Sequence, residues 1–187
     1  MKTIIFSMVL ASAVSASAGM KFGVADMLKL VKNHPSYDTN RALLISTEKD
    51  YKKKLDAFKS EAEEIQEEAK KFAEQLRNPM LADKAKAEIE KKIVEHQNKF
   101  IAAQQKLRSE AMRSQQDLAD LEARLLKAQT ADIRKRIGDF AKDKGYDMVF
   151  DSQAAVFCKD GFDVTDEILK AMGVDPAKAK AAGNEGK

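Results

Sequence analysis

The chain has 187 residues, of which 34% are charged and 6% aromatic, and it contains no Trp, a composition typical of long, solvated helices. The formal net charge is +3, and basic and acidic residues are mixed along the middle of the chain. This near balance excludes the strong basic field that a nucleic-acid-binding protein uses.

Residues 1–18 carry the three parts of a secretory signal peptide. Lys2 gives a positive start, residues 4–14 form a short apolar stretch, and Ala16-Ser17-Ala18 is a cleavage site of small residues. The apolar stretch is too short to span a bilayer about 30 Å thick as a helix. We therefore expect export and a soluble mature chain that begins near Gly19, rather than a retained anchor or a buried helix.

The first folded segment alternates apolar with polar or small residues over 21–26, which predicts a half-buried strand. Asp26 then opens a short helix over residues 27–32. His34-Pro35 stops this helix, because proline disfavours helical geometry in the residue before it.

Two long amphipathic helices follow, and they are separated only by Asn78-Pro79. The first is expected from Asn40 to about Arg77, and the second from near Leu81 to about Lys144. Apolar residues recur at steps of three and four in both, which predicts an antiparallel helical hairpin with a narrow coiled-coil seam. The expected seam residues are Tyr51, Leu55, Phe58, Ile65, Phe72, Leu76, Ile89, Ile93, Phe100 and Leu107.

The second helix is longer than the first, about 90 Å against about 55 Å at the usual rise per residue. Its C-terminal part must therefore extend past the hairpin and into the part of the protein that carries it. The seam also slips once, because Leu107 to Ala111 is a second four-residue step in succession.

The C-terminal region resumes the strand character of the start. Gly145 is placed to end the long helix, residues 146–151 alternate as a strand, and residues 155–159 predict a further strand. Asp160-Gly161 is a turn signal.

A short helix follows, with Thr165 as its N-cap and an end at Gly173. From Val174 onward the chain is rich in Ala, Lys, Gly and Pro, which predicts a disordered tail over residues 174–187.

These elements predict an α+β protein that is mostly α, with a helical-hairpin arm over residues 40–139 and a turn near residues 78–81. The body combines residues 19–39 with residues 140–173 and is too small to bury a stable core alone. We expect it to be completed by strands from other copies in a symmetric oligomer. The residues expected in this shared body are Phe22, Val24, Met148, Phe150, Val156 and Cys158.

Cys158 is the one cysteine, so no intramolecular disulfide can form. We interpret it as a small apolar residue in a strand. The alternative is an intermolecular disulfide between the Cys158 residues of two copies.

Both ends of the chain resemble the Skp (OmpH) family of periplasmic chaperones. The strand Lys21–Met27 (KFGVADM) and the His34-Pro35 stop are similar to the family's opening segment. The closing segments Gly145–Asp151 (GYDMVFD), Ala154–Phe157 (AAVF) and Asp163–Leu169 (DVTDEIL) resemble its C-terminal pattern.

The resemblance implies a homotrimer with a small β-barrel-like body and three hairpin arms around a cavity. It also implies an ATP-independent periplasmic holdase that keeps unfolded outer-membrane proteins from aggregating. The sequence agrees in having no Gly-rich phosphate loop. We expect no cofactor, no metal and no catalytic residue, and client contacts near the arm tip at Arg77, Met80, Lys84 and Lys86. Anionic lipid or lipopolysaccharide is a further partner that the resemblance implies, although the family's basic cluster on the second arm helix has no counterpart here.

The competing interpretation is a periplasmic coiled-coil scaffold without clients, which the helical pattern alone permits. A lipid-binding helix would need a broader apolar face than a narrow seam. An enzyme has no support, because His34 and His96 are isolated in the sequence.

Overall fold

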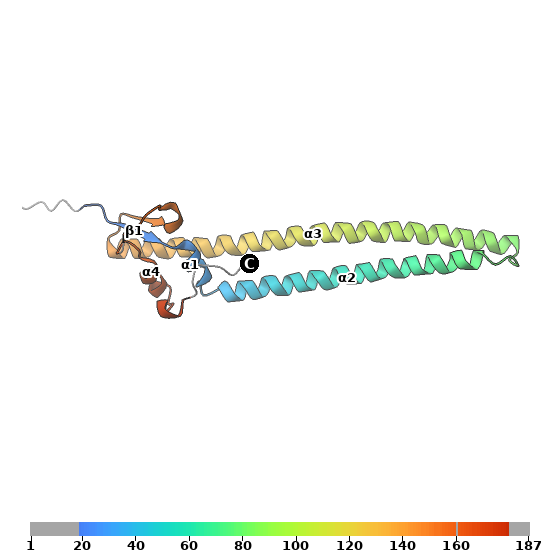
Figure 1. The fold of residues 1–187 in the computed structure, drawn as a ribbon, viewed down its shortest axis with the longest axis horizontal. Helices are drawn as coiled ribbons and strands as arrows, with labels where there is room; N and C mark the ends of the chain where they lie inside the picture. The colour runs from blue at the N-terminus through green and yellow to red at the C-terminus, as the bar shows by residue number, and fades with distance from the viewer. Residues whose placement is uncertain (1–18, 160, 180–187) are drawn as a thin grey trace, which may run out of the picture.

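The computed structural model describes residues 19–159 and 161–179, and the predicted signal peptide lies outside them. The elements in chain order are β1 (Phe22–Ala25), α1 (Met27–Lys32), α2 (Tyr37–Leu76), α3 (Asp83–Lys144), β2 (Met148–Asp151), the 3-10 turn η1 (Ser152–Ala154), α4 (Thr165–Ala171) and the 3-10 turn η2 (Pro176–Lys178). The mostly helical fold with a long α2–α3 hairpin is confirmed. Figure 1 shows this hairpin projecting from a small body that holds the strands, α1 and α4.

The two arm helices begin and end close to the positions that the sequence signals give. With 40 residues α2 is about 60 Å long, and with 62 residues α3 is about 93 Å long. Pro35 lies just before the N-cap Ser36, so α2 starts at Tyr37, a few residues earlier than expected. In the turn after α2, the Asn78 Oδ1 atom accepts a hydrogen bond from the Met80 backbone N–H at 3.0 Å.

Gly145 ends α3 in a left-handed conformation (φ 67°), which a residue without a side chain adopts at little cost. The chain then reverses and places β2 parallel to β1, with Phe22 opposite Met148 and Ala25 opposite Asp151. The entire arm is therefore the connection between two neighbouring parallel strands. On the other side of β1, the Val24 backbone exchanges hydrogen bonds with Phe162 and Val164 at 2.7 and 2.8 Å.

One small hydrophobic core holds the body together. It is built from β1, α1, the last part of α3, and the segment around α4. Its buried members are Ala25, Leu30, Ile133, Phe140, Val164, Ile168, Leu169 and Met172. The part of α3 that extends past α2 supplies Ile133 and Phe140, so the extra length predicted for this helix anchors the arm in the body.

The strand expected over residues 155–159 is wrong for this chain on its own. Its backbone bonds belong to local turns: the Ala155 N–H donates to the Ser152 carbonyl and the Lys159 carbonyl accepts the Phe162 N–H, both at 3.2 Å. Val156 and Phe157 are exposed. A strand needs a neighbouring backbone to complete its ladder, and no described segment lies beside this one in that role.

Two further expectations at the C-terminal end need correction. Val164, not Thr165, is the N-cap of α4, because the helix already begins at Thr165. The Asp163 carboxylate accepts the Thr165 N–H at 2.9 Å. The Thr165 hydroxyl is instead used to accept the Asp26 backbone N–H. Residues 174–179 are ordered, since Val174 and Ala179 pack against the core; residues 180–187 lie outside the described residues.

Replacing Ile133 by Ala should lower the free energy of unfolding by about 2 to 4 kcal/mol, because a fully buried side chain leaves a cavity in a small core. Urea denaturation followed by circular dichroism measures the change. Ile101→Ala is the control, because Ile101 lies on the same helix but is exposed, so its effect should stay within about 0.5 kcal/mol. Equal losses from the two variants would contradict the assignment of Ile133 as the anchor.

Candidate functional site

Four polar side-chain pairs set the register of α2 against α3. They are Tyr51 with Asp117 (3.5 Å), Lys54 with Glu110 (2.6 Å), Glu61 with Lys106 (3.5 Å) and Glu68 with His96 (3.0 Å). Position numbers fall along α3 as they rise along α2, so the helices are antiparallel. Because exposed pairs of this kind contribute at most about 1 kcal/mol each, they specify alignment more than stability.

The predicted seam residues lie between the two helices. The small residues Ala62 and Ala103, at seam positions of α2 and α3, are buried. Every larger member of the seam is only half-buried: Tyr51, Leu55, Phe58, Ile65, Phe72, Leu76, Ile89, Ile93, Phe100 and Leu107. A hairpin of two helices covers each seam side chain from one side alone, so the arm keeps partly accessible apolar surface along its whole length.

Lysine side chains cover two seam aromatics of α2, Phe58 and Phe72. The Lys106 and Lys54 ammonium groups lie 4.4 and 5.7 Å from the centre of the Phe58 ring. Phe72 lies 5.4 Å from the Lys92 ammonium group. Such contacts are worth about 0.5 to 1 kcal/mol at exposed sites. The flexible lysine stems can therefore move aside at little cost and uncover the rings.

His96 belongs to this seam and is held on both ring nitrogens. Its Nε2 atom is 3.0 Å from the Glu68 carboxylate, and its Nδ1 atom is 2.9 Å from the Lys92 carbonyl oxygen. The ring also lies 5.1 Å from the Phe72 ring, centre to centre. These contacts describe a packed seam residue.

The seam changes position towards the root of the arm, beyond the predicted slip. Ala111 is exposed while Ser114 is buried, and near the root Gln129 is buried while its neighbour Ala128 is exposed. The Gln129 Nε2 atom has no hydrogen-bond partner among the described residues. The stretch of α3 nearest the body is thus less apolar than the heptad pattern predicts.

The arm root is joined to the α1–α2 connection by a cluster of three side chains. The buried His34 ring lies 3.0 Å from the Asp132 carboxylate through Nε2, and the Arg136 guanidinium donates to the same oxygen at 2.7 Å. The His34 Nδ1 atom accepts the backbone N–H of Ser36, the N-cap of α2, at 3.2 Å. Hydrogen bonds from Arg136 and His34 lower the pKa of Asp132 below its ordinary value.

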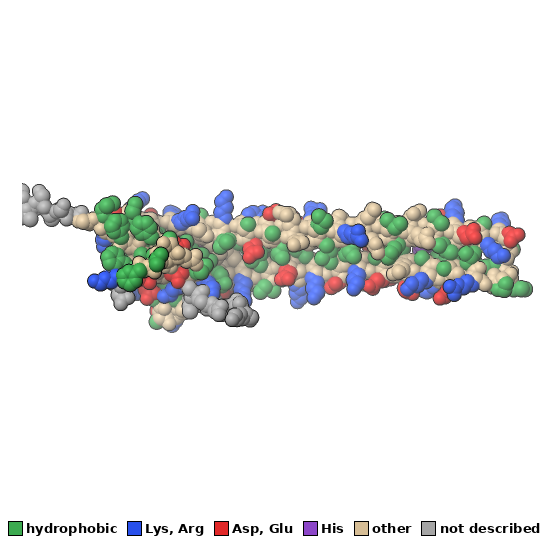
Figure 2. Space-filling model, turned by 45° about the horizontal axis from the view of Figure 1, so that its top comes forward, with side chains coloured by type: hydrophobic (Ala, Val, Ile, Leu, Met, Phe, Trp, Pro, Cys, Tyr) green, Lys and Arg blue, Asp and Glu red, His purple; other side chains and the backbone are tan. Residues whose placement is uncertain are grey.

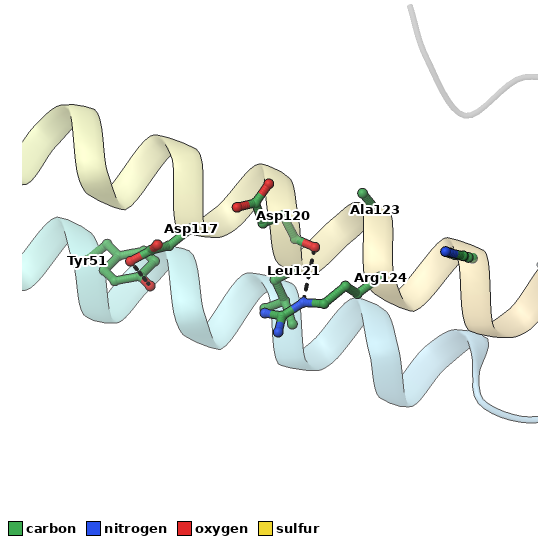
Figure 3. Close-up of a pocket in the computed structure, with 7 residues that line it drawn as sticks. Tyr51, Asp117, Asp120, Leu121, Ala123 and Arg124 are labelled. Atoms are coloured by element: carbon green, nitrogen blue, oxygen red, sulfur yellow. Dashed lines mark hydrogen bonds between the residues drawn. The ribbon is translucent and has the colours of Figure 1, made fainter.

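One hollow on the arm is open, with a volume of about 670 Å³ and a lining of both polar and apolar side chains. Figure 3 shows Tyr51 from α2 facing Asp117, and Arg124 turned back to bond the Asp120 carbonyl oxygen at 3.3 Å. Its groups bond one another and do not converge on a common point. This arrangement offers no enclosed site for a small molecule.

The predicted tip residues lie in or beside the α2–α3 turn. Met80 is 89% exposed, and Arg77 and Lys84 are exposed as well. Lys86 is half-buried, and its ammonium group lies 3.9 Å from Asp83. The tip therefore presents an apolar side chain among cationic ones.

The residues predicted for the shared body divide into two groups. Val24 lies inside the sheet, while Phe22, Met148 and Phe150 leave apolar surface exposed, with the Phe22 and Phe150 rings 6.2 Å apart. Val156 is exposed, and so is the Cys158 side chain. In the part of the chain that the structure describes, β2 pairs only with β1, so its outer edge is unpaired. The body thus combines an open strand edge with apolar side chains.

Over residues 19–159 and 161–179, no three His, Cys, Asp or Glu side chains gather as metal ligands would. Within the same ranges, none of the helices has the length and apolar character needed to cross a membrane.

Asp132 predicts an acid-dependent part of the stability. Because its pKa is lower in the folded protein than in the unfolded chain, its carboxylate stabilises the fold above the unfolded value of about 3.9, and this contribution disappears as the pH falls through the folded value. The difference in free energy of unfolding between the parent and Asp132→Asn should therefore be complete at pH 6 and shrink below about pH 4. Urea unfolding over a pH series measures it. A difference that stays constant down to pH 2 would be inconsistent with this role.

A family model, "Outer membrane protein (OmpH-like)", matches residues 21–172, which is most of the chain. No curated protein matches this chain.

Proposed function

We propose, on the premise that this chain belongs to the OmpH-like (Skp) family, that it is a holdase chaperone that needs no ATP. Its clients are unfolded outer-membrane proteins in transit through the periplasm, and its role is binding, without catalysis or a cofactor. The predicted signal peptide over residues 1–18 would deliver it there.

The observation that carries this proposal is the half-buried seam of a long, unsupported arm. An enzyme or a tight receptor gathers its groups in an enclosed pocket, whereas this arm spreads weak apolar contacts over a length of about 60 Å or more. Many weak contacts suit a client that has no fixed shape. Phe58 and Phe72, each covered by a lysine that can move aside, give the arm adjustable apolar surface.

The body supports assembly into a homotrimer, as expected for the family. Its core has only a few fully buried side chains, and β2 leaves one edge open beside exposed Phe22, Met148 and Phe150. Open edges and apolar patches of this kind pair readily with another chain. Three copies around an axis would hold three arms about one cavity, and a client inside it would be kept apart from other clients.

The same proposal assigns client contacts to the arm tip and adds anionic lipid as a partner. Exposed Met80 with Arg77 and Lys84 would add client contacts at the cavity mouth, together with Lys86. Anionic lipid or lipopolysaccharide would be a second partner through these cationic groups.

The first prediction of this proposal concerns mass. Light scattering on the mature chain at micromolar concentration should give three times the monomer mass. Replacing the exposed residues Met148 and Phe150 together by Ser should lower this mass, while the helical signal of the arm persists. A monomeric parent protein would reject the shared body.

The second prediction concerns aggregation. Dilution of a urea-unfolded outer-membrane protein into buffer with the mature chain, without nucleotide, should suppress turbidity at a small molar excess of trimer. Phe72→Asp places a charge in the seam and should weaken suppression by about fivefold or more while the mass is unchanged. Unchanged turbidity with the parent protein would favour the scaffold interpretation instead.

A further inference from the structure

The outward face of α3 has two flanks. One carries Lys91, Glu95, Arg113, Asp120 and Lys127, and the other is almost free of charge. Residues of the uncharged flank follow steps of three and four and lie one or two positions from seam residues, so they face away from α2. We call this the back stripe: Val94, Asn98, Ile101, Gln105, Arg108, Met112, Gln116, Ala119, Ala123 and Leu126. Every member is exposed, and Arg108 alone is charged.

The outer face of α2 has a different character. Positions two residues beyond its seam are Lys53, Ala57, Ser60, Glu64, Glu67, Lys71 and Glu74, all exposed and mostly charged. A charged outer face is the usual condition of a solvated helix. In Figure 2 charged side chains stand along both edges of the arm and are more crowded along the lower edge, where α2 lies. In a chain with 34% charged residues, the neutral back stripe is a departure that solvation alone does not require.

The back stripe combines two kinds of side chain. Val94 and Ile101 are each 54% exposed, and Met112 is 74% exposed. Between them lie the amides of Asn98 and Gln105, each of which carries both a hydrogen-bond donor and an acceptor. Gln116 uses one amide hydrogen on Asp120 at 3.0 Å.

This pattern fits an extended chain better than a folded partner. Ile101 and Met112 are 11 residues apart, about 16 Å along the axis, so the apolar groups do not merge into one patch. A stable folded interface needs about 800 Å² on each side with a close-packed centre. A second arm would also bury the amides against a helix whose own backbone groups are already paired. An unfolded chain, in contrast, brings unpaired backbone N–H and C=O groups that amides can satisfy.

We propose that the back stripe of α3 is the contact surface for an extended segment of the unfolded client. Its apolar side chains take up client side chains, and its amides pair with client backbone. The inference rests on the proposed holdase function and names the surface that performs it. A neutral surface of this kind binds without regard to client charge, since backbone groups are common to all sequences.

Photo-crosslinking tests the placement directly. A benzophenone amino acid is introduced at Gln105 on the back stripe or at Ser60 on the outer face of α2, in the full mature chain. These positions lie at similar heights on the arm, because Phe58 and Lys106 are in contact across the seam. With urea-diluted outer-membrane protein, position 105 should give about five times more client adduct than position 60. Equal yields, or adducts between two copies in place of client adducts, would overturn the proposal.

A matched pair of variants tests the energetics in the turbidity assay. Ile101→Ser with Met112→Ser should raise the chaperone concentration needed for half suppression by about fivefold. Ile45→Ser is the control, because Ile45 is 57% exposed but lies on α2, and it should leave that concentration unchanged. Circular dichroism and mass should be the same for all variants.

Turbidity with the parent protein distinguishes a failure of the back-stripe proposal from a failure of the proposed holdase function. If it suppresses turbidity but the double variant suppresses equally well, the back stripe is not the contact surface and the holdase function stands. If the parent protein itself fails to suppress turbidity, the holdase function is lost and the back-stripe proposal with it.

Discussion

A hairpin of two helices buries only the small side chains of its seam, and the rest of this molecule depends on that constraint. Each larger apolar side chain between α2 and α3 meets a partner on one side and solvent on the other, so Phe58 and Phe100 are only half-buried. Charged side chains keep such an arm in solution, and lysines lie over its aromatic rings. The arm is consequently a helical structure that keeps partly accessible apolar surface along its seam.

The body resolves the problem of holding so long an arm with so few core residues. α3 extends beyond α2 and places Ile133 and Phe140 among Leu30, Ile168 and Leu169, so the arm and the core share one continuous helix. The His34–Asp132–Arg136 cluster joins the start of α2 to the same helix. Both arm helices are therefore attached to the body, one through packing and one through polar contacts.

Local signals in the sequence were enough to predict the helices and most of their ends, because Asp26, Pro35, Asn78-Pro79 and Gly145 act on their immediate neighbours. The starts of α2 and α4 were missed by a few residues or less. They did not reveal that β1 pairs in parallel with β2, since alternation shows which face of a strand is buried but not which strand lies beside it. The segment 155–159 shows the same limit, because it has strand character without a described partner.

The candidate surfaces were predictable to a similar degree. The seam followed from heptad spacing, but its shift to Gln129 near the root depended on how α3 meets α1 and α2. The back stripe could have been found from sequence by placing the residues of α3 around a helical wheel, because one outer flank then carries a single charge. Its significance came from the exposure of its residues and from the contrast with α2.

Because β1 pairs in parallel with β2, the arm is a long connection that begins after one strand and ends before its neighbour in the sheet. The buried core does not constrain how many helical turns the arm contains, because its residues lie outside most of the arm. Removing or adding one heptad in both α2 and α3 would change its reach by about 10 Å while preserving the register of the seam and the geometry of the strands. Paired insertions or deletions in α2 and α3 can thus adjust the length of the arm to the size of a client without changing the body.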